Sequence, residues 1–379
     1  MIVLDAVGAG ELPDAAAFGD VGSSTLAHVA SAVGGLDLPN LQRLGLGNVL
    51  PLAGCPPDPG SSSIAGRLVE RSLGKDTTTG HWELMGIVTE VAMPTYPDGF
   101  PADVIARFSA AVDRGVIGNV AASGTEIIDR LGEEHQRSGS LIVYTSADSV
   151  FQIAAHEQTV PIEELYAVCE IARAQLVGEH AVGRVIARPF DGEPGAYART
   201  TRRHDFSLAP PRPNHLTRIR KAGLSVTGVG KIADVFAGLD VDRSFPVSSN
   251  REGIAVTLDR LADTEAGLIF VNLVETDMTY GHRNDPIGFH RCLQEFDAAL
   301  PDLLDTLGRD DLLIITSDHG CDPTTPSTDH SREHALLLAH SPGSTRHGRH
   351  DGFFSDVGAT AAAWLGVPGT SLVGEPIEL

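Results

Sequence analysis

The sequence predicts an α/β protein of two domains, built around a mostly parallel sheet flanked by helices. Its 379 residues are too many for one ordinary domain, so two domains are the natural expectation. Short apolar runs alternate with helical patterns along the chain, as they do in α/β folds. Hydrophobic residues make up 42% of the sequence and charged residues 21%, which is typical of a globular protein with a large core.

Three apolar runs predict strands of the larger sheet. Residues Ile2–Leu4 form the end of a buried strand, Gly267–Val274 a second strand and Leu312–Ile315 a third. The segment between the last two predicts a helix, because its apolar residues recur at three- and four-residue steps. These residues are Phe289, Cys292, Leu293, Phe296, Leu300 and Leu303. A strand, a helix and a strand of this length predict a parallel pair.

The middle of the chain has an α/β pattern of its own. Leu141–Thr145 and Val185–Ala187 predict strands, and Ile162–Leu176 predicts a helix. Proline-rich turns at Ala92–Pro97 and Ala209–Pro213 bracket this region. Such segments are typical of hinges between domains, so we expect the middle of the chain to form a separate domain.

The formal net charge of −22 limits the partners of this protein. A negative field repels nucleic acid and anionic membranes, so neither is expected to bind. No apolar run reaches the roughly 20 residues that span a bilayer. The opening Met1–Asp5 has neither a basic region nor a signal-like apolar stretch, which predicts a cytoplasmic protein.

One region of this acidic chain is basic. Between Arg184 and Lys221 there are nine lysines and arginines and only three acidic residues. A phosphate-containing ligand would need such a local positive charge, because the overall field repels it. A solvated basic face explains the same composition equally well, so both interpretations stay open here.

Acidic and histidine side chains follow the three core strands. Asp5, Asp277 and Asp318 each come at or shortly after a strand end. His282 and His319 accompany two of these acids, and a further Asp–His pair ends at His330. Sites in open α/β sheets form beyond the carboxyl ends of the strands, so we expect these groups to converge.

This mixture of ligand types predicts a divalent metal site. Carboxylates with imidazoles suit Mn²⁺ or Zn²⁺ better than Mg²⁺, which prefers oxygen ligands and water. Two such ions could bridge one phosphoryl group. The segment Gly74–Glu83 offers three adjacent threonine hydroxyls as nucleophiles, beginning at Thr77. A polar, helix-capping turn is the simpler explanation of this segment when it is taken alone.

The cysteines and the remaining histidines are expected to be structural. Four cysteines are scattered without a CxxC pair, which predicts reduced thiols and no disulfide framework. Cys321, close to Asp318, is expected to neighbour a metal and not to bind it. The segment Ala339–Asp351 predicts a loop with solvated histidines. No dinucleotide-binding glycine fingerprint follows the first strand, and no Walker motif occurs.

Distinctive segments are spread along the chain from one end to the other. They are residues 3–5, 19–22, 38–41, 74–77, 80–83, 122–125, 131–135, 144–152, 184–190, 203–205, 229–234, 281–283, 317–320 and 328–330. With these segments the sequence resembles the bacterial phosphopentomutases of the alkaline phosphatase superfamily. Gly74-Lys-Asp-Thr77 and Ser146-Ala-Asp-Ser-Val-Phe-Gln152 are the most specific of them.

The resemblance implies a domain arrangement and a set of site residues. An alkaline-phosphatase-like core would comprise residues 1–92 and 210–379, and a smaller α/β cap domain would be inserted at residues 93–209. One Mn²⁺ would be bound by Asp5, Asp318 and His319, and a second by Asp277, His282 and His330. Thr77 would be the phosphorylated threonine. The substrate contacts would be Asp148, Arg184, Ile186, Arg199 and Lys231, with the basic cluster binding the phosphate that is not transferred.

The implied activity is that of an isomerase, an intramolecular phosphotransferase acting on a small pentose phosphate. Ribose or deoxyribose 1-phosphate and 5-phosphate would interconvert through a phosphothreonine enzyme and a bisphosphate intermediate. A sugar bisphosphate would prime the enzyme. The alternatives are a mutase for a modified pentose, another phosphotransferase or phosphatase of the superfamily such as a phosphoglycerate mutase, and a non-enzymatic sugar-phosphate sensor.

Overall fold

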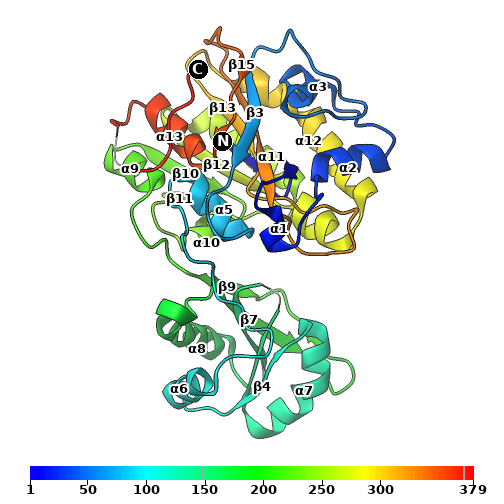
Figure 1. The fold of residues 1–379 in the computed structure, drawn as a ribbon. Helices are drawn as coiled ribbons and strands as arrows, with labels where there is room; N and C mark the ends of the chain where they lie inside the picture. Colours follow the sequence, from blue (N-terminus) through cyan, green and yellow to red (C-terminus); the bar gives the residue numbers. More distant parts are fainter. Residues whose placement is uncertain (147, 370–371) are drawn as a thin grey trace. The chain divides into compact units, whose positions relative to one another are not determined.

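The computed structural model describes residues 1–146, 148–369 and 372–379, so Ala147 of the segment Ser146–Gln152 lies outside the described residues. The chain forms two compact units (Figure 1). Unit 1 comprises Met1–Val91 and Pro210–Leu379, and unit 2 comprises Ala92–Ala209. Unit 1 is therefore assembled from both ends of the chain, and each unit is described by itself below.

The described residues of unit 1 form a ten-stranded sheet in the order β11-β10-β12-β1-β13-β14-β3-β15, with β2 paired to β14 and β16 to β3. Its strands are β1 (Ile2–Leu4), β2 (Gly8–Glu11), β3 (Ile64–Val69), β10 (Ser225–Val229), β11 (Arg243–Phe245), β12 (Gly267–Leu273), β13 (Leu313–Thr316), β14 (Glu333–His340), β15 (Gly348–Arg349) and β16 (Gly352–Phe353). Strand β1 pairs in parallel with β12 and β13, and β14 runs antiparallel to its neighbours β13, β3 and β2. The prediction of a mostly parallel α/β sheet is confirmed.

Helices cover both faces of this sheet (Figure 1). The helices of unit 1 are α1 (Ala15–Phe18), α2 (Thr25–Ala32), α3 (Pro39–Arg43), α4 (Leu46–Val49), α5 (Thr77–Leu84), α9 (His215–Lys221), α10 (Ile232–Val235), α11 (Asn250–Asp263), α12 (Pro286–Thr306) and α13 (Ser355–Trp364). Side chains of α2, α3 and α12 pack with those of β1, β12 and β13 in one hydrophobic core. All six apolar positions predicted for the helix after β12 are buried in α12.

Unit 2 contains a six-stranded sheet in the order β4-β5-β6-β7-β8, with β9 paired to β7, within the described residues. Its elements are β4 (Val116–Ala121), β5 (Leu141–Thr145), β6 (Val150–His156), β7 (Arg184–Asp191), β8 (Ala198–Arg199), β9 (His204–Ser207), α6 (Ala102–Val112), α7 (Gly124–Ser138) and α8 (Ile162–Gln175). Helices α6 and α8 cover one face of the sheet, and α7 packs on the opposite face.

Two boundaries predicted from the sequence are wrong. Strand β7 is longer than Val185–Ala187, because arginines on one of its faces interrupt the apolar run without ending the strand. The predicted loop Ala339–Asp351 instead begins with the last two residues of β14, which is buried between β13 and β3. His350 is not simply solvated, since its Nε2 lies 3.3 Å from an Asp356 carboxylate oxygen.

Among residues 1–146, 148–369 and 372–379, we find no helix with the length and apolar character needed to cross a bilayer.

Candidate metal centre

Three buried carboxylates meet at the carboxyl ends of the central strands of unit 1. Asp5 directly follows β1, Asp277 lies in the helical turn Thr276–Tyr280 after β12, and Asp318 follows β13. Their exposed fractions are 0%, 4% and 0%. Because these strands are parallel and adjacent, their carboxyl ends share one edge of the sheet, as the sequence predicts.

Asp5, Asp318 and His319 form the first group. One ligand atom of each lies within 4.8 Å of the others. The Nε2 atom of His319 is 3.4 Å from Oδ1 of Asp5 and 3.4 Å from Oδ2 of Asp318. The Nδ1 atom of this ring is 3.0 Å from the Gly320 carbonyl oxygen. Because a carbonyl only accepts, Nδ1 carries the proton, and the Nε2 lone pair faces the two carboxylates with room for a cation between them.

Asp277 lies between two imidazoles in the second group. Its Oδ2 is 3.3 Å from Nε2 of His282, and its Oδ1 is 3.5 Å from Nε2 of His330. His319 belongs to this group too, because ligand atoms of Asp277, His319 and His330 also lie within 4.8 Å of one another. The ring centroids of His319 and His330 are 4.0 Å apart, so the two groups form one continuous centre.

This centre fits divalent cations. Oδ1 of Asp5 is buried and accepts no hydrogen bond from the residues that the structure describes. A buried acceptor without a donor is costly, and a cation would satisfy it. The set of carboxylate oxygens and Nε2 lone pairs matches ions of the Mn²⁺ and Zn²⁺ type. The six ligands predicted from the sequence are thus brought together.

The charges of the three acids act on one another. Burial, followed by the charges of Asp318 and Asp277, raises the pKa of Asp5 well above its usual range, and Lys231 opposes this rise. Burial alone would also raise the pKa of Asp277, but His330 and the other nearby imidazoles outweigh it and lower the pKa. Bound dications would favour the ionised form of all three acids.

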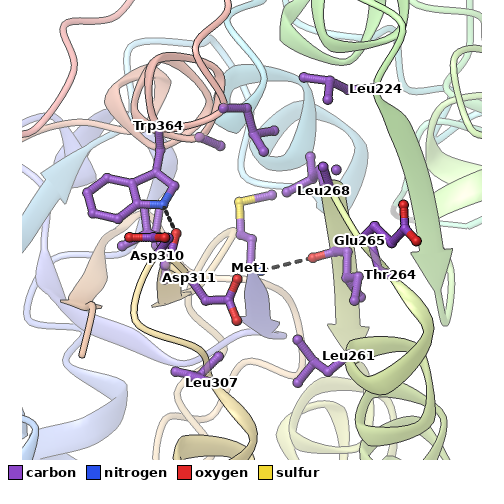
Figure 2. Close-up of a pocket in the computed structure, with 17 residues that line it drawn as sticks. Met1, Leu224, Leu261, Thr264, Glu265, Leu268, Leu307, Asp310, Asp311 and Trp364 are labelled. Carbon is purple, nitrogen blue, oxygen red and sulfur yellow. Dashed lines mark hydrogen bonds between the residues drawn. The ribbon is translucent and has the colours of Figure 1, made fainter. Parts of the chain in front are cut away.

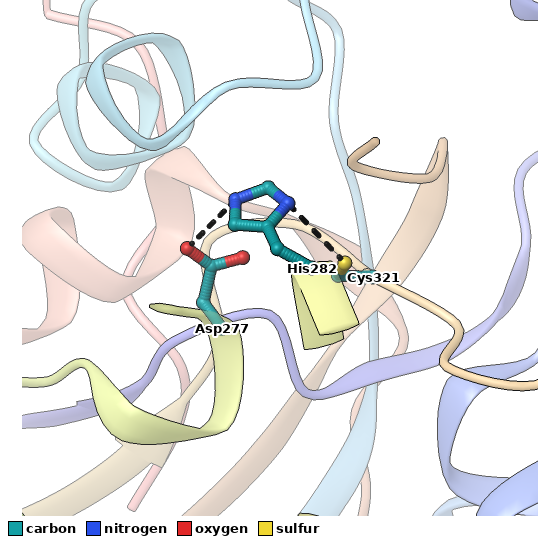
Figure 3. Close-up of side chains that lie close together, drawn as sticks. All are labelled: Asp277, His282 and Cys321. Carbon is teal, nitrogen blue, oxygen red and sulfur yellow. Dashed lines mark hydrogen bonds and ion pairs between the residues drawn. The ribbon is translucent and has the colours of Figure 1, made fainter. Parts of the chain in front are cut away.

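Cys321 lies behind His282 (Figure 3). The ring of His282 lies between the Asp277 carboxylate and the Cys321 sulfur, with one nitrogen toward each. Nδ1 is 4.0 Å from Sγ and 2.6 Å from the Thr328 carbonyl oxygen that it donates to. Cys321 therefore faces the nitrogen that carries the proton, on the side of the ring opposite the predicted ligand atom. Ligand atoms of Asp277, His282 and Cys321 nevertheless lie within 4.8 Å of one another, so the expectation that Cys321 does not bind a metal stays a prediction.

Thr77 presents its hydroxyl group to this centre. Its Oγ1 is 3.2 Å from Nε2 of His319. Helix α5 begins at Thr77, and Asp76 caps it by accepting hydrogen bonds from the Thr79 backbone N–H at 3.1 Å and the Thr79 hydroxyl at 2.6 Å. The capping turn is thus confirmed, and the same segment places the Thr77 hydroxyl beside His319, while the role of Thr77 as a nucleophile stays a prediction. A β carbon at Gly80 would lie 2.1 Å from the Asp318 carbonyl oxygen, so glycine permits this close approach.

Two site residues were missed by sequence reasoning. His81 lies one helical turn after Thr77, and its Nδ1 is 2.9 Å from the Thr77 carbonyl oxygen and 3.1 Å from Oδ2 of Asp318. Asn272 donates to Oδ2 of Asp5 at 3.0 Å. The available signals were the four-residue spacing of His81 from Thr77 and the single polar side chain within the apolar run of β12.

The predicted substrate contacts lie in both units. In unit 2, Nη2 of Arg184 is 3.4 Å from Asp148, and Ile186 is buried two residues further along β7. Arg199 lies on β8 and contacts neither Asp148 nor Arg184. In unit 1, Lys231 follows β10 and is close enough to Asp5 to lower its pKa.

The basic region is not one cluster. In unit 2, Arg202 pairs with Glu157. In unit 1, Arg220 pairs with Asp242 at 2.7 Å.

A cavity of about 370 Å³ lies at the opposite edge of the unit 1 sheet (Figure 2). Its lining includes Met1 and Leu268, at the amino-terminal ends of β1 and β12, and Trp364 of α13. The Met1 ammonium donates a hydrogen bond to the Ile269 carbonyl oxygen at 2.9 Å. Because the carboxylates lie beyond the other ends of these strands, this cavity is not part of the metal centre.

Comparison with known proteins identifies the family. The family model described as Metalloenzyme superfamily matches residues 1–368. The phosphopentomutase of Caldanaerobacter subterraneus subsp. tengcongensis is 53% identical over 382 residues, covering 99% of this chain and 97% of that protein. The phosphopentomutase of Anaeromyxobacter dehalogenans is 54% identical, with the same coverage of both chains. The PH0037 protein of Pyrococcus horikoshii shares the fold, with a TM-score of 0.50, 14% identity and 97% of each chain covered. The chain therefore belongs to the phosphopentomutase family of the metalloenzyme superfamily.

Proposed function

We propose that this protein is a phosphopentomutase, which interconverts ribose or deoxyribose 1-phosphate and 5-phosphate. The observation that carries the proposal is the Thr77 hydroxyl, 3.2 Å from His319 in a buried carboxylate–imidazole centre. Identity of 53% over 99% of the chain to a phosphopentomutase supports the same substrate class. A chain with a net charge of −22 suits a small-molecule enzyme of the cytoplasm better than a nucleic-acid-binding protein.

Two divalent ions, which we propose to be Mn²⁺, would be held by the chain. Asp5, Asp318 and His319 would hold the first, and Asp277, His282 and His330 the second. When bound, such ions offset the negative charge of a transferring phosphoryl group and lower the pKa of a nearby hydroxyl group. The unsatisfied Oδ1 of Asp5 and the Nε2 atoms facing carboxylates support this assignment.

Thr77 would carry the phosphoryl group. A sugar bisphosphate first phosphorylates Oγ1 and leaves as a monophosphate. In each turnover the bond between Oγ1 and phosphorus breaks while the free hydroxyl of a pentose monophosphate bonds to phosphorus, and the proton of that hydroxyl ends on the released Oγ1. The pentose bisphosphate then reorients, and Oγ1 takes the other phosphoryl group. His81, bonded to the Thr77 carbonyl oxygen, would hold the start of α5 in place during these steps.

Residues 93–209 would form the inserted cap domain of the family. Asp148, Arg184, Ile186 and Arg199 of this region would contact the substrate, together with Lys231. Carboxylates suit sugar hydroxyls, and the planar guanidinium group of arginine suits phosphate oxygens.

A direct assay tests the proposed function. The purified protein is incubated with Mn²⁺, a catalytic amount of ribose 1,5-bisphosphate and ribose 5-phosphate, and ³¹P NMR follows the phosphate esters. We expect ribose 1-phosphate to form without release of inorganic phosphate. Release of inorganic phosphate in proportion to substrate loss would identify a phosphatase. Conversion of 3-phosphoglycerate but not of ribose 5-phosphate would identify a phosphoglycerate mutase.

A further inference from the structure

Arg332 is a buried cation that follows a candidate metal ligand. It comes two residues after His330, directly before β14, and is 1% exposed. Its Nε and Nη2 atoms donate to the two oxygens of the Asp14 carboxylate, at 3.1 Å and 3.0 Å. Nη1 donates to Oε2 of Glu70 and to the Gly74 carbonyl oxygen, at 2.6 Å each, and Nη2 also donates to the Glu70 carbonyl oxygen at 3.0 Å. These bonds use all the N–H groups of the guanidinium, so none remains for a substrate.

One of these bonds reaches the segment that leads to Thr77. Residues 70–76 form neither a helix nor a strand, so contacts with other segments must hold them in place. Gly74 lies in this segment, three residues before Thr77. Strands β3 and β14 are antiparallel neighbours, and Arg332 at the start of β14 contacts Glu70 at the end of β3. Arg332 therefore ties the segment to the edge of the sheet where β3 ends.

Lys75 joins the same parts of the chain a second time. Its Nζ is 3.1 Å from Oδ2 of Asp20 and 3.2 Å from Oδ2 of Asp329. Oδ2 of Asp20 also accepts a hydrogen bond from the backbone N–H of Arg332, at 2.9 Å. Oδ1 of Asp329 accepts one from the backbone N–H of His330, at 2.9 Å. Lys75 is thus connected to the chain on both sides of His330.

The proposed phosphoryl carrier and the candidate metal ligands come from distant parts of the chain. Helix α5 begins at Thr77, whose Oγ1 lies 3.2 Å from Nε2 of His319. The ring centroids of His319 and His330 are 4.0 Å apart. Contacts between residues 74–75 and residues 329–332 therefore set where the Thr77 hydroxyl group lies relative to the centre. A misplacement of about 1 Å can slow such a reaction about 100-fold.

We propose that Arg332 and Lys75 are positioning residues for phosphoryl transfer. Together they hold residues 74–77, and with them the Thr77 hydroxyl group, against the segment that carries His330. Arg332 acts through the Gly74 carbonyl group, and Lys75 acts through two carboxylates. This inference rests on the proposed function and deepens it, because it gives a role to two cations outside the candidate ligands and substrate contacts.

Arg332→Lys tests the positioning role. Lysine keeps the positive charge beside Glu70, but its donors all lie on one atom and cannot replace the planar fork. With Mn²⁺ and ribose 1,5-bisphosphate present, we expect kcat for ribose 5-phosphate to fall about 10- to 100-fold, while KM changes less than about threefold. Lys75→Met should have the same effect, and Lys75→Arg, which keeps the charge, should recover most of the loss.

Hydrogen exchange of the Mn²⁺-loaded protein without substrate gives a second measurement, which does not depend on turnover. Residues 73–84 should exchange faster in Arg332→Lys and Lys75→Met, and residues 141–156 of unit 2 should be unchanged. Arg349→Met is the matched control. Arg349 also pairs with an aspartate, Asp351, at 2.7 Å, and donates to the Asn48 carbonyl oxygen at 2.7 Å. Its variant should keep kcat within about twofold, as expected for a residue outside the site, with natural exchange at residues 73–84.

The outcomes separate positioning from simple stabilisation of the fold. If Arg332→Lys unfolds at lower urea concentration but keeps the natural kcat and the natural exchange at residues 73–84, the positioning role is overturned. If Arg332→Lys fails to fold, Lys75→Met decides in the same way, because Lys75 is partly exposed. A natural protein that does not convert ribose 5-phosphate would overturn the proposed function. The exchange of residues 73–84 would then still decide whether Arg332 and Lys75 hold this segment.

Discussion

The three adjacent threonines differ in what their hydroxyl groups contact. The Thr79 hydroxyl donates to Asp76 at 2.6 Å and is committed to capping α5. The Thr77 hydroxyl lies 3.2 Å from His319. Residue type alone does not distinguish the three threonines. The position of the helix start gives their hydroxyl groups different surroundings. Helix geometry turns successive side chains by about 100°, so the hydroxyl groups face different directions.

The first prediction therefore concerns Thr77. Thr77→Ala should abolish mutase activity while the fold and the bound metal are retained, because the carrier oxygen is lost. Thr77→Ser keeps that oxygen and should retain measurable activity. Mass spectrometry of the primed enzyme should locate the phosphate on Thr77. Phosphate on Thr78 or Thr79 would contradict the assignment.

The second prediction concerns His81, which contacts both the Thr77 carbonyl oxygen and the Asp318 carboxylate. Losing a residue that orients a metal ligand typically costs about 10- to 100-fold in metal affinity or activity. His81→Ala should lose activity by this amount, and added Mn²⁺ should restore part of it. The control is His347→Ala, an exposed histidine of the same unit. A variant with full activity at low Mn²⁺ would show that His81 is dispensable.

At the scale of elements, the sequence predicts the strands that are most apolar. β1, β12 and β13 are found within a residue or two of their predicted limits, and α12 buries its predicted stripe. The predicted range Val185–Ala187 is shorter than strand β7, because Arg184 and Arg188 alternate with the apolar residues of the strand. Those polar positions lie on the face of the unit 2 sheet against which α7 packs, so the apolar run alone does not show the full length of the strand.

The pattern of strand ends predicts the candidate metal ligands as one group, and only the family resemblance divides them into two sets. The ends of the predicted strands indicate that Asp5, Asp277 and Asp318 converge, since neighbouring parallel strands end at one edge of the sheet. His319 lies close to both sets. This position depends on the direction of its side chain after β13, which the spacing of residues along the sequence does not determine. His81 comes from a helix whose own pattern carries no metal signal, so its approach to Asp318 depends on tertiary packing.

The start of α9 provides a pH-dependent prediction. His215 is buried, and burial lowers its pKa from 6.5 to about 4. Between these values the unfolded chain binds a proton that the folded chain does not, so stability is lost as the pH falls below 6.5. From pH 6.5 to 5 the loss is about 2 kcal/mol, at about 1.4 kcal/mol per pH unit.

Chemical denaturation at pH 7 and pH 5 checks this value. His215→Gln cannot take up the proton, so its free energy of unfolding should fall less than that of the natural protein by about 2 kcal/mol. His347→Gln, in which an exposed histidine is replaced, serves as the control and should follow the natural protein. If His215→Gln follows it as well, His215 does not cause the acid sensitivity.

At the scale of the whole molecule, the candidate metal ligands lie in one unit only. Among the described residues, each group that could hold a metal ion is in unit 1. Chelation should therefore destabilise unit 1 selectively, by about 2.7 kcal/mol if the ion is present at 100 times its dissociation constant. Hydrogen exchange should increase around residues 277–282 and 318–330. Residues 141–156 of unit 2 should be unchanged, and equal loss of protection in both units would contradict this prediction.

Unit 2 is continuous in sequence and has hydrophobic clusters on both faces of its own sheet. A continuous segment with its own core can fold alone. A protein of residues 92–209 should therefore unfold cooperatively, as measured by circular dichroism during urea titration. The Phe151→Ala version, which empties the centre of the α6–α8 core, should be about 3–5 kcal/mol less stable. A non-cooperative transition in the natural segment would show that it depends on unit 1.

The position of β1 at the centre of the sheet has a consequence for synthesis on the ribosome. Ile2 is made before every other strand residue of this sheet, yet its partners are Val271 and Ile315. At roughly 5–20 residues per second, the first strand waits about 13–54 s for Val271 to be translated. Unit 2 emerges complete within that interval, while the apolar strand that precedes it has no partner. A nascent chain of this protein must therefore be protected from aggregation at β1, and chaperone dependence should concentrate in the interval before β12 leaves the exit tunnel.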